Sequence, residues 1–136
     1  MIRPINKDRT ILEKKARPAT RMDVQTAQNL CETLLAHANG CAGMAANMIG
    51  IPVAIIAFFN GPVLMEMFNP VITKRSGKYL AREGCLSLPG ERSAFRYKNI
   101  TVTWEDRSFV THTADFTGFA AQTIQHEIDH LNGLLI

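Results

Sequence analysis

The residues His126-Glu127-Ile128-Asp129-His130 form an H-E-x-x-H motif near the end of the chain. On a helix, side chains four positions apart lie on one face, so both imidazoles can bind one metal ion. Glu127 lies beside them and can move a proton during hydrolysis. The motif therefore predicts a helix that carries a hydrolytic metal site, and the alternative is two surface histidines on an ordinary helix.

The size and composition of the chain fit one small domain. The 136 residues are 46% hydrophobic and 20% charged, with a net charge of +3. These values are typical of a globular protein with one core. The weak positive charge gives no reason to expect sequence-specific nucleic-acid binding. We expect a single domain over residues 1–136.

Two further features bear on the compartment. No apolar run approaches the length of a membrane span, and residues 1–15 contain no apolar h-region of a signal peptide. We therefore expect a cytoplasmic protein without membrane contact. The cysteines Cys31, Cys41 and Cys85 are odd in number, and a reducing compartment argues against disulfides.

The N-terminal part of the chain predicts one helix. Thr20 and Asp23 resemble a capping box, and an apolar stripe at helical spacing follows over residues 22–38. Cys31 lies on this stripe, which favours a buried apolar role. Asn39-Gly40 would end the helix.

Four segments are expected to form strands in two hairpins, because β-branched and aromatic residues cluster or alternate in them. Their bounds are 53–59, 63–68, 100–105 and 109–116. Asn60-Gly61-Pro62 joins the first pair, and Asn69-Pro70 breaks the pattern after it. Val71-Ile72-Thr73 can continue the strand beyond this break. His112 falls in the last strand, where a half-exposed strand histidine is favoured over a metal ligand.

The motif helix should follow Thr117 as N-cap, reach about residue 132 and end at Gly133. Its apolar stripe, expected to face the core, consists of Ala121, Ile124, Ile128, Leu131 and Leu135. A mixed second face carries both histidines and suits the wall of a cleft. The expected fold is α+β, with antiparallel strands and hairpins around this central helix and an N-terminal helix beside them.

Two histidines do not complete a catalytic site of the zinc type, which normally has three protein ligands and a water. Neither Glu nor His follows His130, so the third ligand must lie upstream. Cys85 is the best candidate, because Gly84 allows an unusual backbone and a loop there can present a thiolate to the helix. Taken alone, Cys85 would be interpreted as a buried structural cysteine.

Three segments, in this order, resemble the signatures of peptide deformylases. Residues 83–87, E-G-C-L-S, are similar to the second signature, and residues 125–131, Q-H-E-I-D-H-L, to the third. Residues 41–48, C-A-G-M-A-A-N-M, resemble the first, a G-x-G-L-A-A-x-Q pattern, less closely. The resemblance covers most of the chain, which is similar to the shorter Gram-positive type of the family.

The resemblance implies that Cys85, His126 and His130 bind one divalent metal ion. Ferrous iron is the usual physiological ion of the family, with zinc or nickel as alternatives. Metal-bound water would attack the formyl group of an N-formylmethionyl peptide, with Glu127 as general base and then general acid. The Leu86 N–H would stabilise the oxyanion, and formate would be released.

Two positions depart from the first signature. Met48 stands where the family has an oxyanion-binding glutamine, and a thioether cannot donate a hydrogen bond. Loss of one such donor typically lowers kcat by about 10²–10³-fold. Cys41 replaces the first glycine. The resemblance therefore implies a deformylase, and it leaves open a weak or altered amidase or a non-catalytic metal-containing binder of formyl peptides.

The resemblance also implies a binding site for the peptide. Gly43 and Met44 lie in the segment that contacts its backbone, and Arg92 near its downstream end. The pocket for the methionine side chain would be formed by Phe119, Gln122 and Thr123. The last two would make its wall more polar than is usual.

Other implied roles lie around this site. Glu83 would orient the cysteine loop, paired with Arg96. The implied partners are formylated nascent peptides. In many members a further C-terminal helix is linked to ribosome docking. It does not follow residue 136, which removes one basis for expecting ribosome contact, and only a transient contact stays open.

Overall fold

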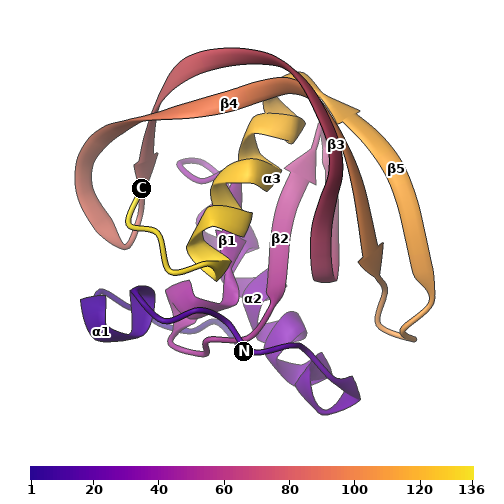
Figure 1. The fold of residues 1–136 in the computed structure, drawn as a ribbon. Helices are drawn as coiled ribbons and strands as arrows, with labels where there is room; N and C mark the ends of the chain where they lie inside the picture. Colours follow the sequence, from indigo (N-terminus) through magenta and orange to yellow (C-terminus); the bar gives the residue numbers. More distant parts are fainter.

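A five-stranded antiparallel sheet arches around one helix in the computed structural model, which describes residues 1–136 (Figure 1). Each strand pairs with the next along the chain, so the sheet order is β1-β2-β3-β4-β5. The strands are β1 (Gly43–Ala45), β2 (Ile55–Asn60), β3 (Val63–Cys85), β4 (Leu88–Glu105) and β5 (Thr111–Thr117). The predicted α+β class is confirmed.

The helices frame this sheet. They are α1 (Arg9–Leu12), the 3₁₀ helices η1 (Arg21–Asp23) and η2 (Ala46–Ile49), α2 (Val24–Ala36) and α3 (Gly118–Leu131). Figure 1 shows α3 inside the arch of β3 and β4, with the N-terminal segments below it. No helix is both long and apolar enough to cross a membrane.

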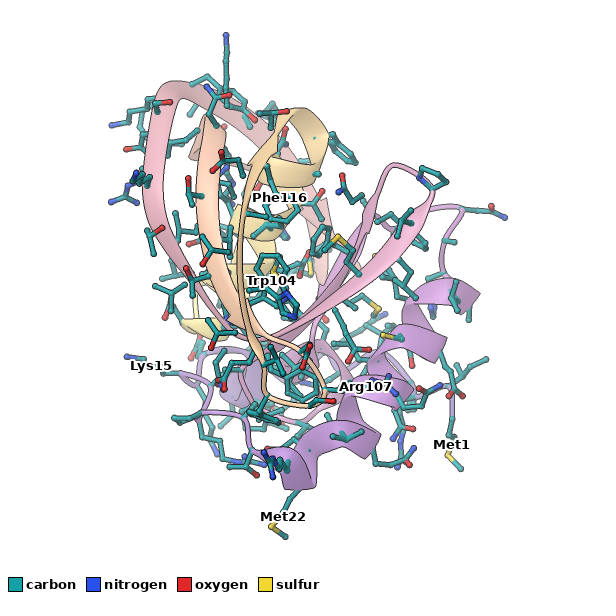
Figure 2. The ribbon with its side chains drawn as sticks, turned by 90° about the vertical axis from the view of Figure 1, so that its right-hand side faces the viewer. Met1, Lys15, Met22, Trp104, Arg107 and Phe116 are labelled. Carbon is teal, nitrogen blue, oxygen red and sulfur yellow. The ribbon has the colours of Figure 1, made fainter.

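Strand β2 is buried on both faces and separates two hydrophobic clusters. Ile55 and Ala57 pack with the apolar stripe of α2, whereas Ile56 and Phe58 pack with that of α3. Successive side chains of a strand point to opposite faces, so this alternation places one helix on each side of β2. On the α3 side of β2, Trp104 of β4 and Phe116 of β5 belong to the same hydrophobic cluster (Figure 2).

The long β3–β4 hairpin differs most from the sequence prediction. The expected break at Asn69-Pro70 is a bulge, where Asn69 takes a φ of 51° and the register shifts, and the strand continues to Cys85. Cys85 therefore ends a strand, and the loop predicted around it is a two-residue turn. Pro89, four residues after Cys85, lies inside β4.

The boundaries of the other elements are close to those predicted. The capping box of Thr20 and Asp23 is present, and α2 ends at Ala36 rather than residue 38. The last strand begins at Thr111, because Phe109 takes a φ of 60° in the preceding turn. Thr117 precedes α3 as expected, but its side chain makes no capping hydrogen bond.

Candidate active site

A cavity of about 470 Å³ lies between α3, the segment around β1 and the tip of the β3–β4 hairpin. It is lined by Gly40, Cys41, Ala42, Gly43, Met48, Arg82, Glu83, Gly84, Cys85, Leu86, Leu88, Gly90, Phe119, Gln122, Thr123, His126 and Glu127. All three signature segments contribute to this list. The fold therefore brings to one place residues that are far apart in the sequence.

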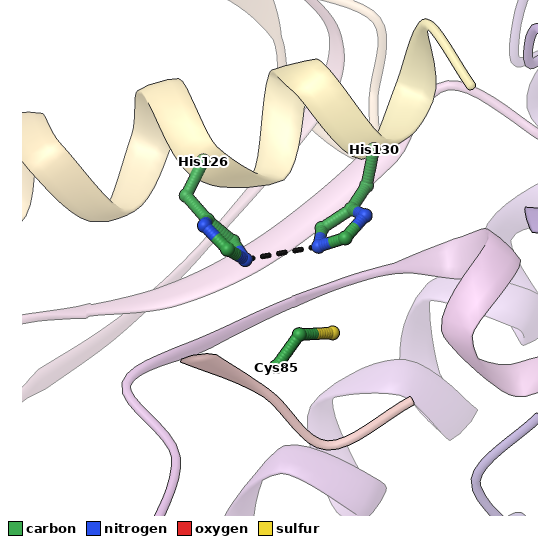
Figure 3. A group of neighbouring side chains, drawn as sticks. All are labelled: Cys85, His126 and His130. Atoms are coloured by element: carbon green, nitrogen blue, oxygen red, sulfur yellow. Dashed lines mark hydrogen bonds between the residues drawn. The ribbon is translucent and has the colours of Figure 1, made fainter. Parts of the chain in front are cut away.

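Three potential metal ligands converge at this cavity. The ligand atoms of Cys85, His126 and His130 all lie within 4.8 Å of one another. The two Nε2 atoms are 2.9 Å apart, and Figure 3 shows both rings on the side of α3 that faces the strand end with Cys85. The i, i+4 spacing aligns the imidazoles, and the hairpin tip supplies the thiol.

A buried ionic network holds His126 in place. Glu83 accepts a hydrogen bond from His126 Nδ1 at 2.7 Å, which leaves Nε2 facing the other ligands. Arg96 donates to both oxygens of Glu83, and its Nη1 donates to Asp129 at 2.6 Å. The expected pairing of Glu83 with Arg96 is confirmed. Its orienting contact, however, is with a histidine on α3.

The charges of this network favour a cation at the ligand cluster. Burial alone would raise the pKa of Glu83, but hydrogen bonds from His126 and Arg96 outweigh it and lower the pKa to about 2. Burial alone would likewise lower the pKa of His126, but interactions with Cys85 and Glu83 raise it to about 10. The negative charge of Glu83 beside this imidazole would also stabilise a metal cation bound to the ring, which must first lose its proton.

Glu127 has the properties of a general base. Its side chain is 3% exposed and lines the cavity, and its Oε1 is buried without a hydrogen-bond partner. Burial raises its pKa to about 7. A carboxylate with a pKa near neutrality is suited to accept and return a proton. The unpartnered oxygen also leaves room for a hydrogen bond from a bound water or substrate.

The first signature places Met48, not Asn47, at the cavity. Met48 lines the wall, and its Sδ lies 3.5 Å from the Ala45 nitrogen. Asn47 is fully buried, and its amide donates to the His130 carbonyl at 2.6 Å. The Asn47 amide therefore holds α3 in place and cannot replace the missing glutamine of the family.

The structure divides the expected peptide-binding residues into two groups. Gly43, Phe119, Gln122 and Thr123 line the cavity, with Phe119 67% exposed. Met44 does not line the cavity, because its side chain is fully buried in the core beside α2, and only its backbone is available to contact a substrate.

Arg92 also lies outside the cavity lining. It is half-buried on β4 opposite Glu83, and its Nη1 donates to the Pro89 carbonyl at 2.9 Å. It is not a solvated loop residue, because it belongs to the long hairpin. Its Nε and Nη2 are buried without hydrogen-bond partners.

Two residues at the site were not singled out from the sequence. Tyr79 donates to Gln122 Oε1 at 3.0 Å, and Asp129 accepts a hydrogen bond from Arg96. Asp129 lies within the H-E-x-x-H motif three residues after His126, so helical spacing could have indicated it. No sequence pattern indicated that Tyr79 lies at the site, because residues 74–99 were not recognised as a hairpin.

Comparison with known proteins gives one consistent result. Residues 2–136 match the family model described as polypeptide deformylase. A peptide deformylase of Clostridium beijerinckii is 45% identical over the full length of both chains. A peptide deformylase of Chlorobium luteolum is 35% identical, with 99% of this chain and 76% of the relative covered.

Solved structures agree with these sequence matches. A crystal structure of peptide deformylase from Thermotoga maritima has a TM-score of 0.89 and 29% identity, covering 99% of this chain and 95% of that one. A class I type b peptide deformylase from Acinetobacter baumannii, solved with Met-Ala-Ser bound, has a TM-score of 0.88 and 30% identity, covering 99% and 97% of the two chains.

Proposed function

The chain belongs to the peptide deformylase family, and on that premise we propose that the cavity around His126 is its catalytic site. Peptide deformylases are metal-dependent amide hydrolases, and this chain removes the N-formyl group from nascent peptides. The observation that supports the site assignment is the convergence of Cys85, His126 and His130 next to a buried carboxylate, Glu127.

The residues present fit a divalent metal ion. A thiolate and two imidazoles suit ferrous iron or zinc, and three protein ligands leave one position for water or substrate. Bound there, the ion supplies Lewis-acid chemistry, lowering the pKa of a water and polarising the formyl oxygen. We propose Cys85, His126 and His130 as its ligands and ferrous iron as the physiological ion, with zinc or nickel able to replace it.

Glu127 is the proton carrier of the proposed mechanism. Its unpartnered Oε1 accepts the proton of the attacking water, and the same carboxyl then gives that proton to the departing amine nitrogen. A pKa near 7 makes both transfers feasible in one catalytic cycle. The products are formate and a free N-terminal amine.

Backbone groups complete the site. The Leu86 N–H lies in the turn after Cys85, outside the strand ladder, and is the proposed donor to the oxyanion. β1 is an edge strand of the sheet, and the carbonyl of Ala42, the residue just before it, accepts a hydrogen bond from the Phe59 N–H. Because the ladder alternates, the Gly43 N–H points to the open edge, where an extended peptide can pair with it.

The proposal also covers the side-chain pocket, the domain and the compartment of the protein. We propose that Phe119, Gln122 and Thr123 surround the first side chain of the peptide. We also propose a single domain over residues 1–136 that acts in the cytoplasm, with no more than transient contact with the ribosome.

Formate release from formyl-Met-Ala-Ser tests the proposal. The protein is prepared anaerobically and loaded with ferrous iron, and Glu127→Ala serves as the blank. We expect kcat/KM near the ordinary enzyme range of about 10⁴ M⁻¹s⁻¹ or more, well above the blank. Turnover equal to the blank with one metal bound per chain would instead support a repurposed or non-catalytic binder, the alternative that Met48 raises.

A further inference from the structure

In the part of α3 proposed to surround the first side chain of the peptide, the polarity of the wall rests on a single residue. Thr123 was expected to add to it, but its hydroxyl donates to the Phe119 carbonyl at 2.9 Å, one turn back. The Thr123 methyl group points instead toward Gly43, where it would meet an added Cβ at 2.6 Å. Gln122 is thus the polar group that this part of the wall presents.

Tyr79 fixes the orientation of that group. The Tyr79 hydroxyl reaches from β3 across the cavity edge and donates to Gln122 Oε1 at 3.0 Å. With the oxygen occupied, the amide nitrogen of Gln122 is left over, and it donates to no other group in the protein. Gln122 is half-buried and lines the cavity one turn before His126. The wall therefore carries a positioned hydrogen-bond donor.

A positioned donor changes which side chains the pocket tolerates. A thioether sulfur is only a weak acceptor, so methionine gains little from it. A sulfoxide oxygen is a strong acceptor, and an apolar wall would penalise its burial because the oxygen would lose its hydrogen bonds to water. Gln122 removes that penalty.

We propose that Gln122, held by Tyr79, extends the substrates of this enzyme to formyl peptides whose first side chain carries an oxygen acceptor, methionine sulfoxide in particular. The proposal rests on the function proposed above. Gln122 is the specificity-determining residue, and Tyr79 is a positioning residue that acts through it.

The test compares two peptides in each protein. We expect the ratio of kcat/KM for formyl-Met(O)-Ala-Ser to that for formyl-norleucine-Ala-Ser to fall at least tenfold in Gln122→Leu, with the two sulfoxide epimers assayed separately. Gln122→Glu has the same shape but replaces the donor by an anion, so the ratio should fall at least as far. The ratio does not depend on the fraction of active enzyme, and it therefore separates specificity from stability.

Tyr79→Phe tests the positioning role. It leaves Gln122 in the wall but frees its amide to turn, so KM for the sulfoxide peptide should rise while kcat stays close to that of the parent protein. Two matched controls lie outside the cavity: Gln28→Leu on α2 and Tyr97→Phe on β4. Both should leave the ratio unchanged.

A ratio that stays within twofold of the parent value in both Gln122→Leu and Gln122→Glu would overturn the proposal while leaving deformylation intact. Failure of the parent protein to release formate from any peptide above the Glu127→Ala blank would instead count against the proposed function. In that case the dissociation constants of unformylated Met(O)-Ala-Ser and norleucine-Ala-Ser give the same ratio without turnover. Equal values for the parent protein and Gln122→Leu would then overturn the inference.

Discussion

At the scale of single residues, Met48 makes the sharpest prediction. Its thioether lies in the cavity wall where the family has a donor to the oxyanion. Met48→Gln should raise kcat by about tenfold or more, since one such donor is typically worth about 10²–10³-fold. Steady-state formate release measures the change. Met48→Leu is the matched control, because leucine fills similar space without a donor. Equal rates for the two variants would mean that another group already serves the oxyanion.

Gly43 makes a second prediction at this scale. An added Cβ would lie 2.6 Å from Thr123 Cγ2 and 3.2 Å from the Ala57 carbonyl oxygen. Overpacking of this kind costs about 1–3 kcal/mol, so Gly43→Ala should lower the free energy of unfolding by that amount. Thr123→Ser removes the obstructing methyl group, and the double variant should recover part of the loss.

Urea unfolding of the four proteins gives the coupling energy between Gly43 and Thr123. Recovery should be incomplete, because Ala57 and the Glu127 side chain, 3.3 Å from the added atom, remain. Strictly additive effects would show that the backbone shifts to make room. The short distance between residue 43 and Thr123 would then not restrict the side chain at position 43.

At the scale of elements, one ionic network joins β3, β4 and α3. Glu83 accepts from His126 Nδ1 and so orients the ring for metal binding. Partners of this kind typically contribute 10–100-fold to metal affinity, so Glu83→Gln should weaken metal binding by about that factor. Competition with a chromophoric chelator measures the affinity. Glu91→Gln, on the exposed part of the same hairpin, should leave it unchanged, and equal losses in both variants would refute the orienting role.

The start of α2 makes a prediction about pH. Arg17 donates to both oxygens of Asp23 at 2.7 and 2.9 Å, and the Thr20 N–H donates to one of them. These hydrogen bonds hold the pKa of Asp23 below its usual value of 3.8, the contribution of Arg17 being the largest. A pKa that is lower in the folded state stabilises the protein above the unfolded pKa, and this stability is lost as the pH falls through the folded pKa.

Asp23→Asn should therefore cost about 0.2–1 kcal/mol at neutral pH, the usual value of an ion pair with one exposed partner. The difference from the parent protein should shrink as the pH falls below about 4, where the parent carboxylate also becomes protonated. Urea titrations at a series of pH values measure this. A difference that does not change with pH would mean that the side-chain shape, and not the charge, supports the helix.

The elements also show which parts of the fold the sequence could predict. Helices α2 and α3 lie where the apolar spacing placed them, because each buries one stripe against β2. The β3–β4 hairpin could not be seen beyond residue 73. Its outer half buries little apolar surface, and its residues are held by pairing with the partner strand, which leaves no periodic pattern in the sequence.

At the scale of the whole molecule, the sequence could indicate the proposed ligand set, but it could not indicate the residues that support this set. His126 and His130 follow from spacing on one helix, and Cys85 followed from resemblance to a known signature. The contacts of Asn47 and Tyr79 join segments 83 and 43 residues apart. Contacts between such distant segments form only when the chain folds, and the local patterns of one sequence do not predict them.

The separation of the ligands along the chain predicts how the metal acts on stability. Cys85 ends β3, and both histidines lie on α3, so an ion bound by all three links two elements that unfolding separates. A ligand present at 100 times its dissociation constant stabilises the folded state by about 2.7 kcal/mol. For a chain of this length that corresponds to a rise in Tm of roughly 10 °C.

Calorimetry of metal-loaded and chelator-treated protein should show this difference, and Cys85→Ser should remove most of it. Cys31→Ser is the matched control, because Cys31 is buried on α2, outside the site. It should lower Tm in both states and preserve the difference between them. If Cys85→Ser kept the full difference, the ion would be held by the two histidines alone. The hairpin tip would then position the substrate and not the metal.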